Sequence, residues 1–188
     1  GVLNSFGNSA KLGKSKWSIL ELDESDGSFI KVLPTYSIIT NIDREHMDYY
    51  KSMNKLFEQF EKFIEKVPSF GKLIICIDDS NNKKLIKKIN FKNFFTFGVS
   101  VNANFQITNI IYKKNSSSFD ILVKLPNKKI FSIKNIRIPL LGLHNIKNAT
   151  AAIAVTLIIG ISTKTIKTGL RQFKGVQRRF NKIFTHKN

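Results

Sequence analysis

The residues of this chain with the clearest chemical potential are carboxylates gathered in one short segment. Glu21, Asp23, Glu24 and Asp26 stand within six positions, directly after an apolar run. Neighbouring carboxylates repel one another unless a cation lies among them, and Mg²⁺ prefers oxygen ligands. The segment therefore indicates either a magnesium site or a solvated acidic loop, and its residues alone do not separate the two.

A second polar group, residues 40–48, follows another apolar run and contains Asp43, Glu45 and His46. An imidazole is not the ligand expected for Mg²⁺, and a lone histidine in a loop is more often a surface or helix-capping group. By itself this group is weak evidence of a site.

The third group opens an alanine-rich segment, residues 142–152, and contains His144, Asn145 and Asn148. The two asparagines are three positions apart and share one face of a helix, where their amides offer the donors and acceptors that read an adenine edge. Capping of the helix by Asn145 is an equally good explanation of the residues alone.

The elements that would position these groups alternate between strand and helix over residues 18–98. Short apolar runs predict buried strands at 16–22, 36–40, 72–77 and 94–97, and apolar residues at helical spacing predict helices at 52–67 and 79–89. In such a sheet, ligands bind at the carboxyl ends of the strands, where the first two polar groups fall.

The pattern changes after residue 100, because three strand-like runs follow without a helix between them, at 104–112, 119–125 and 129–138. Two helices then follow at 145–159 and 162–173, with Ser162 as the predicted cap of the second. We expect the α/β class: a Rossmann-like, mostly parallel sheet flanked by helices, with a small antiparallel sheet inserted.

Composition narrows the class of protein less than the motifs do. The formal charge of +18 would suit nucleic acid, but the lysines are scattered, and an Asn-, Ile- and Phe-rich composition is typical of A/T-rich codons. No apolar run is long enough for a membrane span. The single cysteine, Cys76, lies in an apolar run, which predicts a buried thiol and fits a reducing cytoplasm.

The segments ELDESDGSF, TNIDREHMD, GLHNIKNATAA and GVQRRF, in this order and at this spacing, resemble the central domain of the Mur ligase family. The resemblance covers residues 1–180, and the ESD-x-SF and HMD details favour the member that joins L-alanine to UDP-N-acetylmuramate. It implies ATP and Mg²⁺ as cofactors, those two small molecules as substrates, a cytoplasmic location, and neither nucleic acid nor membrane as partner.

The resemblance also implies roles for individual residues. Glu21 and His46 match catalytic residues that hold the magnesium ions. The other matching positions comprise a nucleotide-binding set, His144, Asn145, Asn148 and Arg179, and a loop facing the sugar nucleotide with Ser25, Asp26 and Ser28. Two departures, Glu45 in place of the family's aspartate and Leu22 in place of a small residue, are conservative.

The family's phosphate loop has no counterpart in residues 1–16, since the glycines and lysines at 7–14 lack a preceding strand and a Gly-Lys-Thr/Ser ending. We expect residues 1–180 to be the central domain without that portion, and 181–188 to begin a linker to a further domain. Because the phosphate-positioning groups are missing, we expect this chain alone to have no ligase activity.

The sequence leaves two alternative functions open. One is a related ligase that attaches a murein peptide or extends folate with glutamate, which the preferred amino-acid substrate would distinguish. The other is a basic nucleic-acid-binding module, which would require a contiguous basic stripe with exposed aromatic side chains.

Overall fold

Parallel pairing joins the first four strands of one sheet. The computed structural model describes residues 9–126, 128–173 and 175. In it β1 (Tyr36–Ile39), β2 (Lys72–Cys76), β3 (Phe94–Gly98) and β4 (Phe105–Lys113) pair in chain order, each parallel to the next. The carboxyl ends of β1, β2 and β3 therefore meet at one edge of the sheet, as the sequence predicts for residues 36–97, and β4 begins beside the end of β3.

The antiparallel part extends the same sheet. β5 (Ser116–Val123) and β6 (Phe131–Ile138) pair antiparallel and give the strand order β1-β2-β3-β4-β5-β6 among the described residues. β4 joins β3 through only two residue pairs, Phe97 with Phe105 and Gly98 with Gln106. The predicted mixed sheet is thus confirmed, with its antiparallel strands continuous with the parallel ones.

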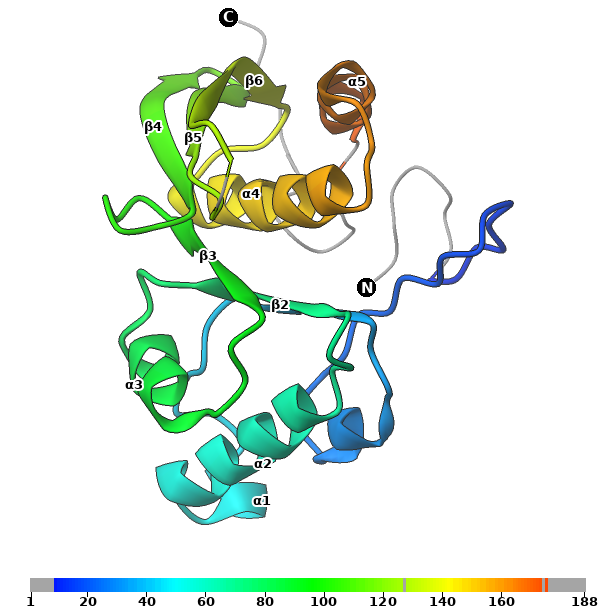
Figure 1. Cartoon of the computed structure of the whole chain (residues 1–188), viewed down its shortest axis with the longest axis vertical. Coiled ribbons are helices and arrows are strands. Elements are labelled where there is room, and N and C mark those ends of the chain that lie inside the picture. Colours follow the sequence, from blue (N-terminus) through cyan, green and yellow to red (C-terminus); the bar gives the residue numbers. More distant parts are fainter. Residues whose placement is uncertain (1–8, 127, 174, 176–188) are drawn as a thin grey trace, which may run out of the picture.

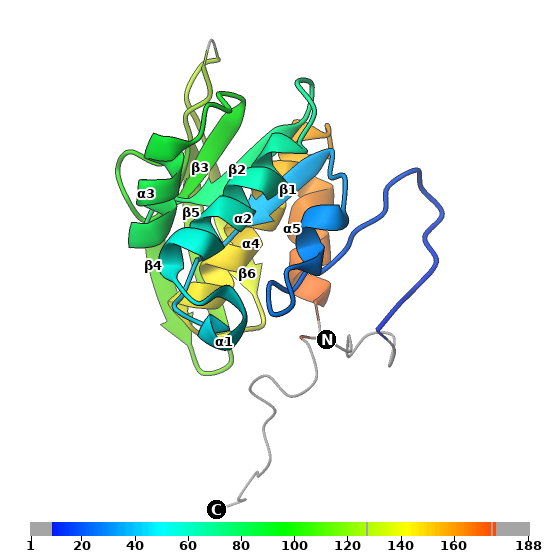
Figure 2. The ribbon, with the colours of Figure 1, turned by 90° about the horizontal axis from the view of Figure 1, so that it is seen from below.

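Helices cover both faces of the parallel strands (Figure 1). α2 (Met53–Glu65) and α3 (Ser80–Lys88) lie on one face, and α4 (Leu143–Ile158) lies on the other, with α5 (Thr163–Gln172) beside β6. Figure 2 shows the same layers from below, with α2 in front of the sheet and α4 behind it. No helix in the described part of the chain is long and apolar enough to cross a membrane.

Successive residues of β2 pack alternately against the helices on the two faces of the sheet. Leu73 and Ile75 pack into the core formed with α2 and α3, whereas Ile74 and Cys76 pack into the core formed with α4 and β4 to β6. All four side chains are buried, which is the apolar pattern expected of a strand covered on both faces. The prediction of a buried Cys76 is confirmed.

Side-chain caps start three of the predicted helices. Ser52 accepts a hydrogen bond from Lys55 N–H, Asp79 from Asn82 N–H, and Ser162 from Thr165 N–H, each satisfying one of the amides left free at a helix start. Capping by Asn145, the alternative explanation of that residue, is not what the structure shows. α4 begins two residues earlier, after Gly142, and Asn145 Nδ2 instead donates to Leu141 O at 2.7 Å.

The predicted buried strand at 16–22 is also wrong in this structure. The segment forms no strand among the described residues, Ile19 and Leu20 are 94% and 65% exposed, and the ring of Trp17 lies tilted against that of Tyr36 in β1, with the ring centroids 5.6 Å apart. A strand exists only where a neighbour accepts its backbone hydrogen bonds, and in the described residues β1 pairs with β2 and no other strand. An apolar run cannot supply that partner by itself.

Three hydrogen bonds from asparagine side chains tie the start of α3 to the backbone at the ends of β1 and β2. The fully buried Asn82, in the first turn of α3, donates from Nδ2 to Thr40 O at 3.2 Å and to Cys76 O at 3.0 Å. Its neighbour Asn81 donates to Ile42 O at 2.6 Å. The start of α3 therefore fixes the backbone that leaves both strands.

We predict that Asn82→Asp lowers the free energy of unfolding by about 2 to 4 kcal/mol near neutral pH, because it buries a carboxyl against two carbonyl oxygens. Burial raises the folded-state pKa of the introduced carboxyl, so the loss should be small below the unfolded-state value of about 3.9 and grow as the pH rises. Urea unfolding at several pH values measures this. Asn81→Asp, at a half-buried site, is the control, and equal losses in the two variants would contradict the prediction.

Candidate active site

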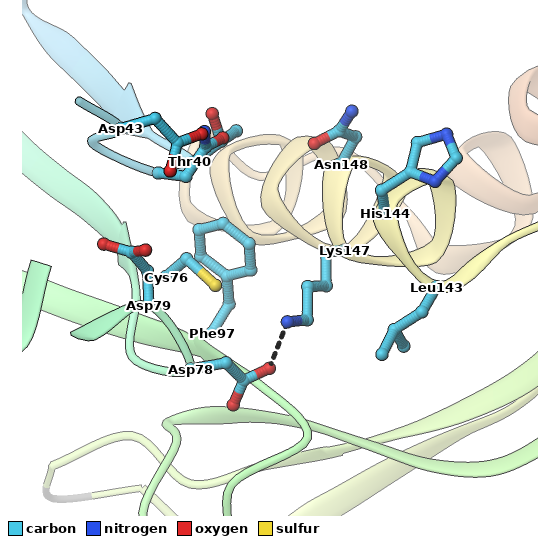
Figure 3. Close-up of a pocket in the computed structure, with 11 residues that line it drawn as sticks. Thr40, Asp43, Cys76, Asp78, Asp79, Phe97, Leu143, His144, Lys147 and Asn148 are labelled. Carbon is cyan, nitrogen blue, oxygen red and sulfur yellow. Dashed lines mark hydrogen bonds and ion pairs between the residues drawn. The ribbon is translucent and has the colours of Figure 1, made fainter. Parts of the chain in front are cut away.

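A cavity of about 440 Å³ lies at the carboxyl ends of β1, β2 and β3, beneath the start of α4 (Figure 3). Its volume is in the range of small-molecule sites, and its position is the one at which open α/β sheets bind ligands. The side chains that line it come from four elements: Thr40, Asn41, Asp43, Cys76, Asp78, Asp79, Phe97, Leu143, His144, Lys147 and Asn148.

The first turns of α4 form one wall of the cavity. His144, Lys147 and Asn148 line it, whereas Asn145 does not and is bound to Leu141 O. Gly142 precedes the helix at a φ of 96°, and a Cβ there would lie 2.9 Å from the His144 ring. Since the first turn contains no acidic residue or side-chain cap, its N–H groups keep their partial positive charge.

The opposite wall contains Asp78, which follows β2. Its carboxylate accepts hydrogen bonds from Val99 N–H at 2.9 Å and Ser100 N–H at 3.0 Å, and pairs with Lys147 Nζ at 2.9 Å. Burial alone would raise the pKa of Asp78, but the bond from Val99, with those from Lys147 and Ser100, outweighs burial and holds the pKa below its ordinary value. Asp78 is therefore an ionised, fully engaged group.

The two acidic segments of the sequence meet at the same edge. Tyr50 Oη donates to Glu24 O, and Gly27 lies so close to Tyr49 that a Cβ would stand 2.6 Å from its hydroxyl oxygen. Burial, then the Glu24 charge, raises the pKa of Tyr50 to about 12, so it stays a donor. These contacts place the loop of residues 21–28 against α1 (Met47–Tyr50), directly after His46.

His46 and two glutamates form a candidate metal site. His46 Nε2 lies 3.9 Å from Glu24 Oε1 and 4.0 Å from Glu45 Oε2, and the ligand atoms of the three groups lie within 4.8 Å of one another. Small side-chain rotations would bring all three atoms to about 2 Å from one cation, and one nitrogen among the ligands suits Mn²⁺ at least as well as Mg²⁺. Glu21, the predicted partner of His46, lies exposed outside this group.

The remaining predicted site residues are Ser25, Asp26, Ser28 and Arg179. Ser25, Asp26 and Ser28 are exposed, and their loop is shaped by its own carboxylates: Asp23 accepts from Ser25 N–H at 2.7 Å and Asp26 from Ser28 N–H at 2.9 Å. Hydrogen bonds with those serines lower the pKa of both aspartates. Arg179 lies outside the described residues.

Asp78 and Lys147 are not among the site residues predicted from the sequence. Asp78 directly follows a predicted strand, so the rule that pointed to residues 21–26 and 43–48 could have found it. Lys147 gave no signal, because it is one lysine among many and its partner lies 69 positions away, at residue 78.

Comparison with known proteins assigns the chain to a family and finds relatives with the same fold. A model of the Mur ligase middle domain matches residues 4–156. The chain is 64% identical over 187 residues to UDP-N-acetylmuramate--L-alanine ligase of Pelagibacter ubique, and 38% identical over 183 residues to the ligase of that name from Rhizorhabdus wittichii. These matches take in 100% and 97% of this chain but 40% and 39% of the relatives.

Solved structures of other proteins have the same fold as this chain. UDP-N-acetylmuramate-alanine ligase MurC of Thermotoga maritima is 25% identical with a TM-score of 0.68, over 88% of this chain and 35% of that one. UDP-N-acetylmuramate:L-alanyl-gamma-D-glutamyl-meso-diaminopimelate ligase of Neisseria meningitides shows the shared fold, at 24% identity and a TM-score of 0.76 over 95% of this chain and 57% of that one. On the match over most of its length and the identity to these relatives, the chain belongs to the Mur ligase family.

Proposed function

We propose that this chain supplies the adenine-side half of an ATP site, and a bound divalent cation, to an enzyme that joins L-alanine to UDP-N-acetylmuramate. The observation that carries the proposal is the cavity between the strand ends and α4, which His144 and Asn148 line, with the His46 group at the same edge of the sheet. The two relatives with similar sequences are both named as ligases of UDP-N-acetylmuramate and L-alanine, which supports the choice of reaction.

In the proposed reaction a substrate carboxylate attacks the γ-phosphate of ATP, and an amine then displaces phosphate from the acyl phosphate formed. Such chemistry depends on alignment and on offsetting negative charge more than on proton transfer. When bound, Mg²⁺ would neutralise phosphate oxygens and reduce their repulsion of the attacking carboxylate.

We assign roles to this chain's own residues accordingly. His144 and Asn148 face the base, Asn145 holds the start of α4 to Leu141, and the free N–H groups of that helix favour the anionic nucleotide. Arg179 is proposed to approach the nucleotide as well.

The acidic side of the site is assigned to the metal and the second substrate. His46, Glu24 and Glu45, together with Glu21 of the same loop, are the proposed metal ligands. Ser25, Asp26 and Ser28, exposed beside them, are proposed to face the sugar nucleotide.

Adenosine binding tests the nucleotide assignment. Because adenosine is uncharged, its binding cannot arise from the net charge of +18. We expect adenosine to shift the amide NMR signals of residues 40–43 and 143–148 in the isotope-labelled chain, and Asn148→Ala to weaken binding about five- to tenfold through loss of one or two hydrogen bonds.

Asn54→Ala, on the exposed face of α2, is the control and should bind like the unmodified chain. Shifts that require a phosphate group, and that inorganic triphosphate reproduces, would show attraction to the basic surface instead and refute the proposal.

Paramagnetic broadening by Mn²⁺ tests the metal assignment. We expect Mn²⁺ to broaden the signals of residues around Glu24, Glu45 and His46 first, and His46→Ala to raise the Mn²⁺ concentration needed by about tenfold, since one of three ligands is lost. His144→Ala removes a histidine outside this group and should leave the titration unchanged. Equal effects of the two variants would argue against a site at His46.

A further inference from the structure

One ion pair crosses the candidate nucleotide cavity. Lys147 extends from α4 to the far wall, where its Nζ lies 2.9 Å from Asp78 Oδ2 (Figure 3). The side chains are only 24% and 10% exposed, so solvent screens this pair less than a surface pair. Lys147 is the one lining residue for which the described structure records an ion pair across this cavity.

Asp78 is an anchor that is itself held in place. Backbone amides of Val99 and Ser100, which follow β3, fix its carboxylate. Gly98 leaves room for that carboxylate, because a Cβ at Gly98, where φ is 151°, would lie 2.5 Å from Asp78 Oδ1. Lys147 is thereby tied to the ends of both β2 and β3.

The pair determines where the rest of the α4 wall lies. His144 is three residues before Lys147 and Asn148 is the next residue, so both belong to the same two turns of α4. The ion pair ties this part of α4 to the strand ends on the cavity side, in addition to the apolar packing of Ile146 and Ala149 in the core. The same contact also neutralises Asp78, whose unpaired charge would repel an anionic nucleotide.

We propose that the Asp78–Lys147 ion pair is a positioning latch: it holds the start of α4 against the ends of β2 and β3, so that His144 and Asn148 stay at adenine-binding distance. The proposal rests on the nucleotide site proposed above. It gives Lys147 a role that does not require direct contact with the nucleotide.

Cys76 provides a reporter of the latch that does not depend on nucleotide. It is the only cysteine of the chain, it lines the cavity, and it is 3% exposed. An alkylating reagent such as N-ethylmaleimide reaches it only when the wall opens. Burial raises the pKa of the Cys76 thiol, and nearby Lys147 opposes that rise, so removing the lysine charge would by itself slow alkylation. Faster alkylation then reports opening.

The experiment compares Lys147→Met with Lys147→Arg and with Lys164→Met in the 188-residue chain. We expect Lys147→Met to speed Cys76 alkylation about tenfold and weaken adenosine binding by a similar factor. Lys147→Arg keeps the ion pair and should restore both values. Lys164→Met, on exposed α5 and outside the cavity, should change neither.

A second variant keeps the test valid if Lys147→Met does not fold, as judged by the dispersion of its amide signals. Asp78→Asn keeps the shape of the side chain and removes the charge that Lys147 pairs with, and should also speed alkylation and weaken adenosine binding.

Unchanged alkylation in a folded Lys147→Met chain would overturn the latch. Faster alkylation with unchanged adenosine binding would show that the latch does not serve the nucleotide, and would overturn its proposed role. Failure of the unmodified chain to bind adenosine would instead refute the nucleotide site, and alkylation would still measure the latch separately.

Discussion

Parallel pairing of β1, β2 and β3 is the constraint on which the rest of the structure depends. Because the strands run in one direction, the segments that leave them at residues 40–48, 77–79 and 98–100 emerge at one edge. α4 covers β2 and β3 from one face and brings its first turns to that edge. The candidate site is assembled by this geometry from segments more than a hundred residues apart in the chain.

Most of the carboxylates of this basic chain lie in the segments at this edge of the sheet. Nine of its 13 carboxylate side chains lie within residues 21–26, 43–48 and 78–79, although the formal net charge is +18. Around His46 the carboxylates are grouped as a cation would require, whereas Asp78 is neutralised by Lys147. The cavity is also lined by Asp43 and Asp79, so a cation bound beside it would offset the repulsion between these carboxylates and an anionic nucleotide.

The sequence predicted local features better than distant contacts. Apolar spacing and capping residues such as Ser52 and Ser162 located the helices, because those signals lie within a few residues of each other. The strand at 16–22 failed because a strand needs a partner that an apolar run does not specify. The grouping of Glu24 and Glu45 with His46 depends on the contacts that Tyr49 and Tyr50 make with the acidic loop, and contacts between separate segments leave no local signal in the sequence.

Photoaffinity labelling with an azido-adenine analogue of ATP tests the central claim most directly, that the adenine end of a nucleotide lies between the strand ends and the start of α4. We expect mass spectrometry to find the label on peptides containing residues 40–43 or 143–148, and excess adenosine to suppress it. Labelling of β5, β6 or α5, or labelling in proportion to lysine content without competition by adenosine, would contradict it.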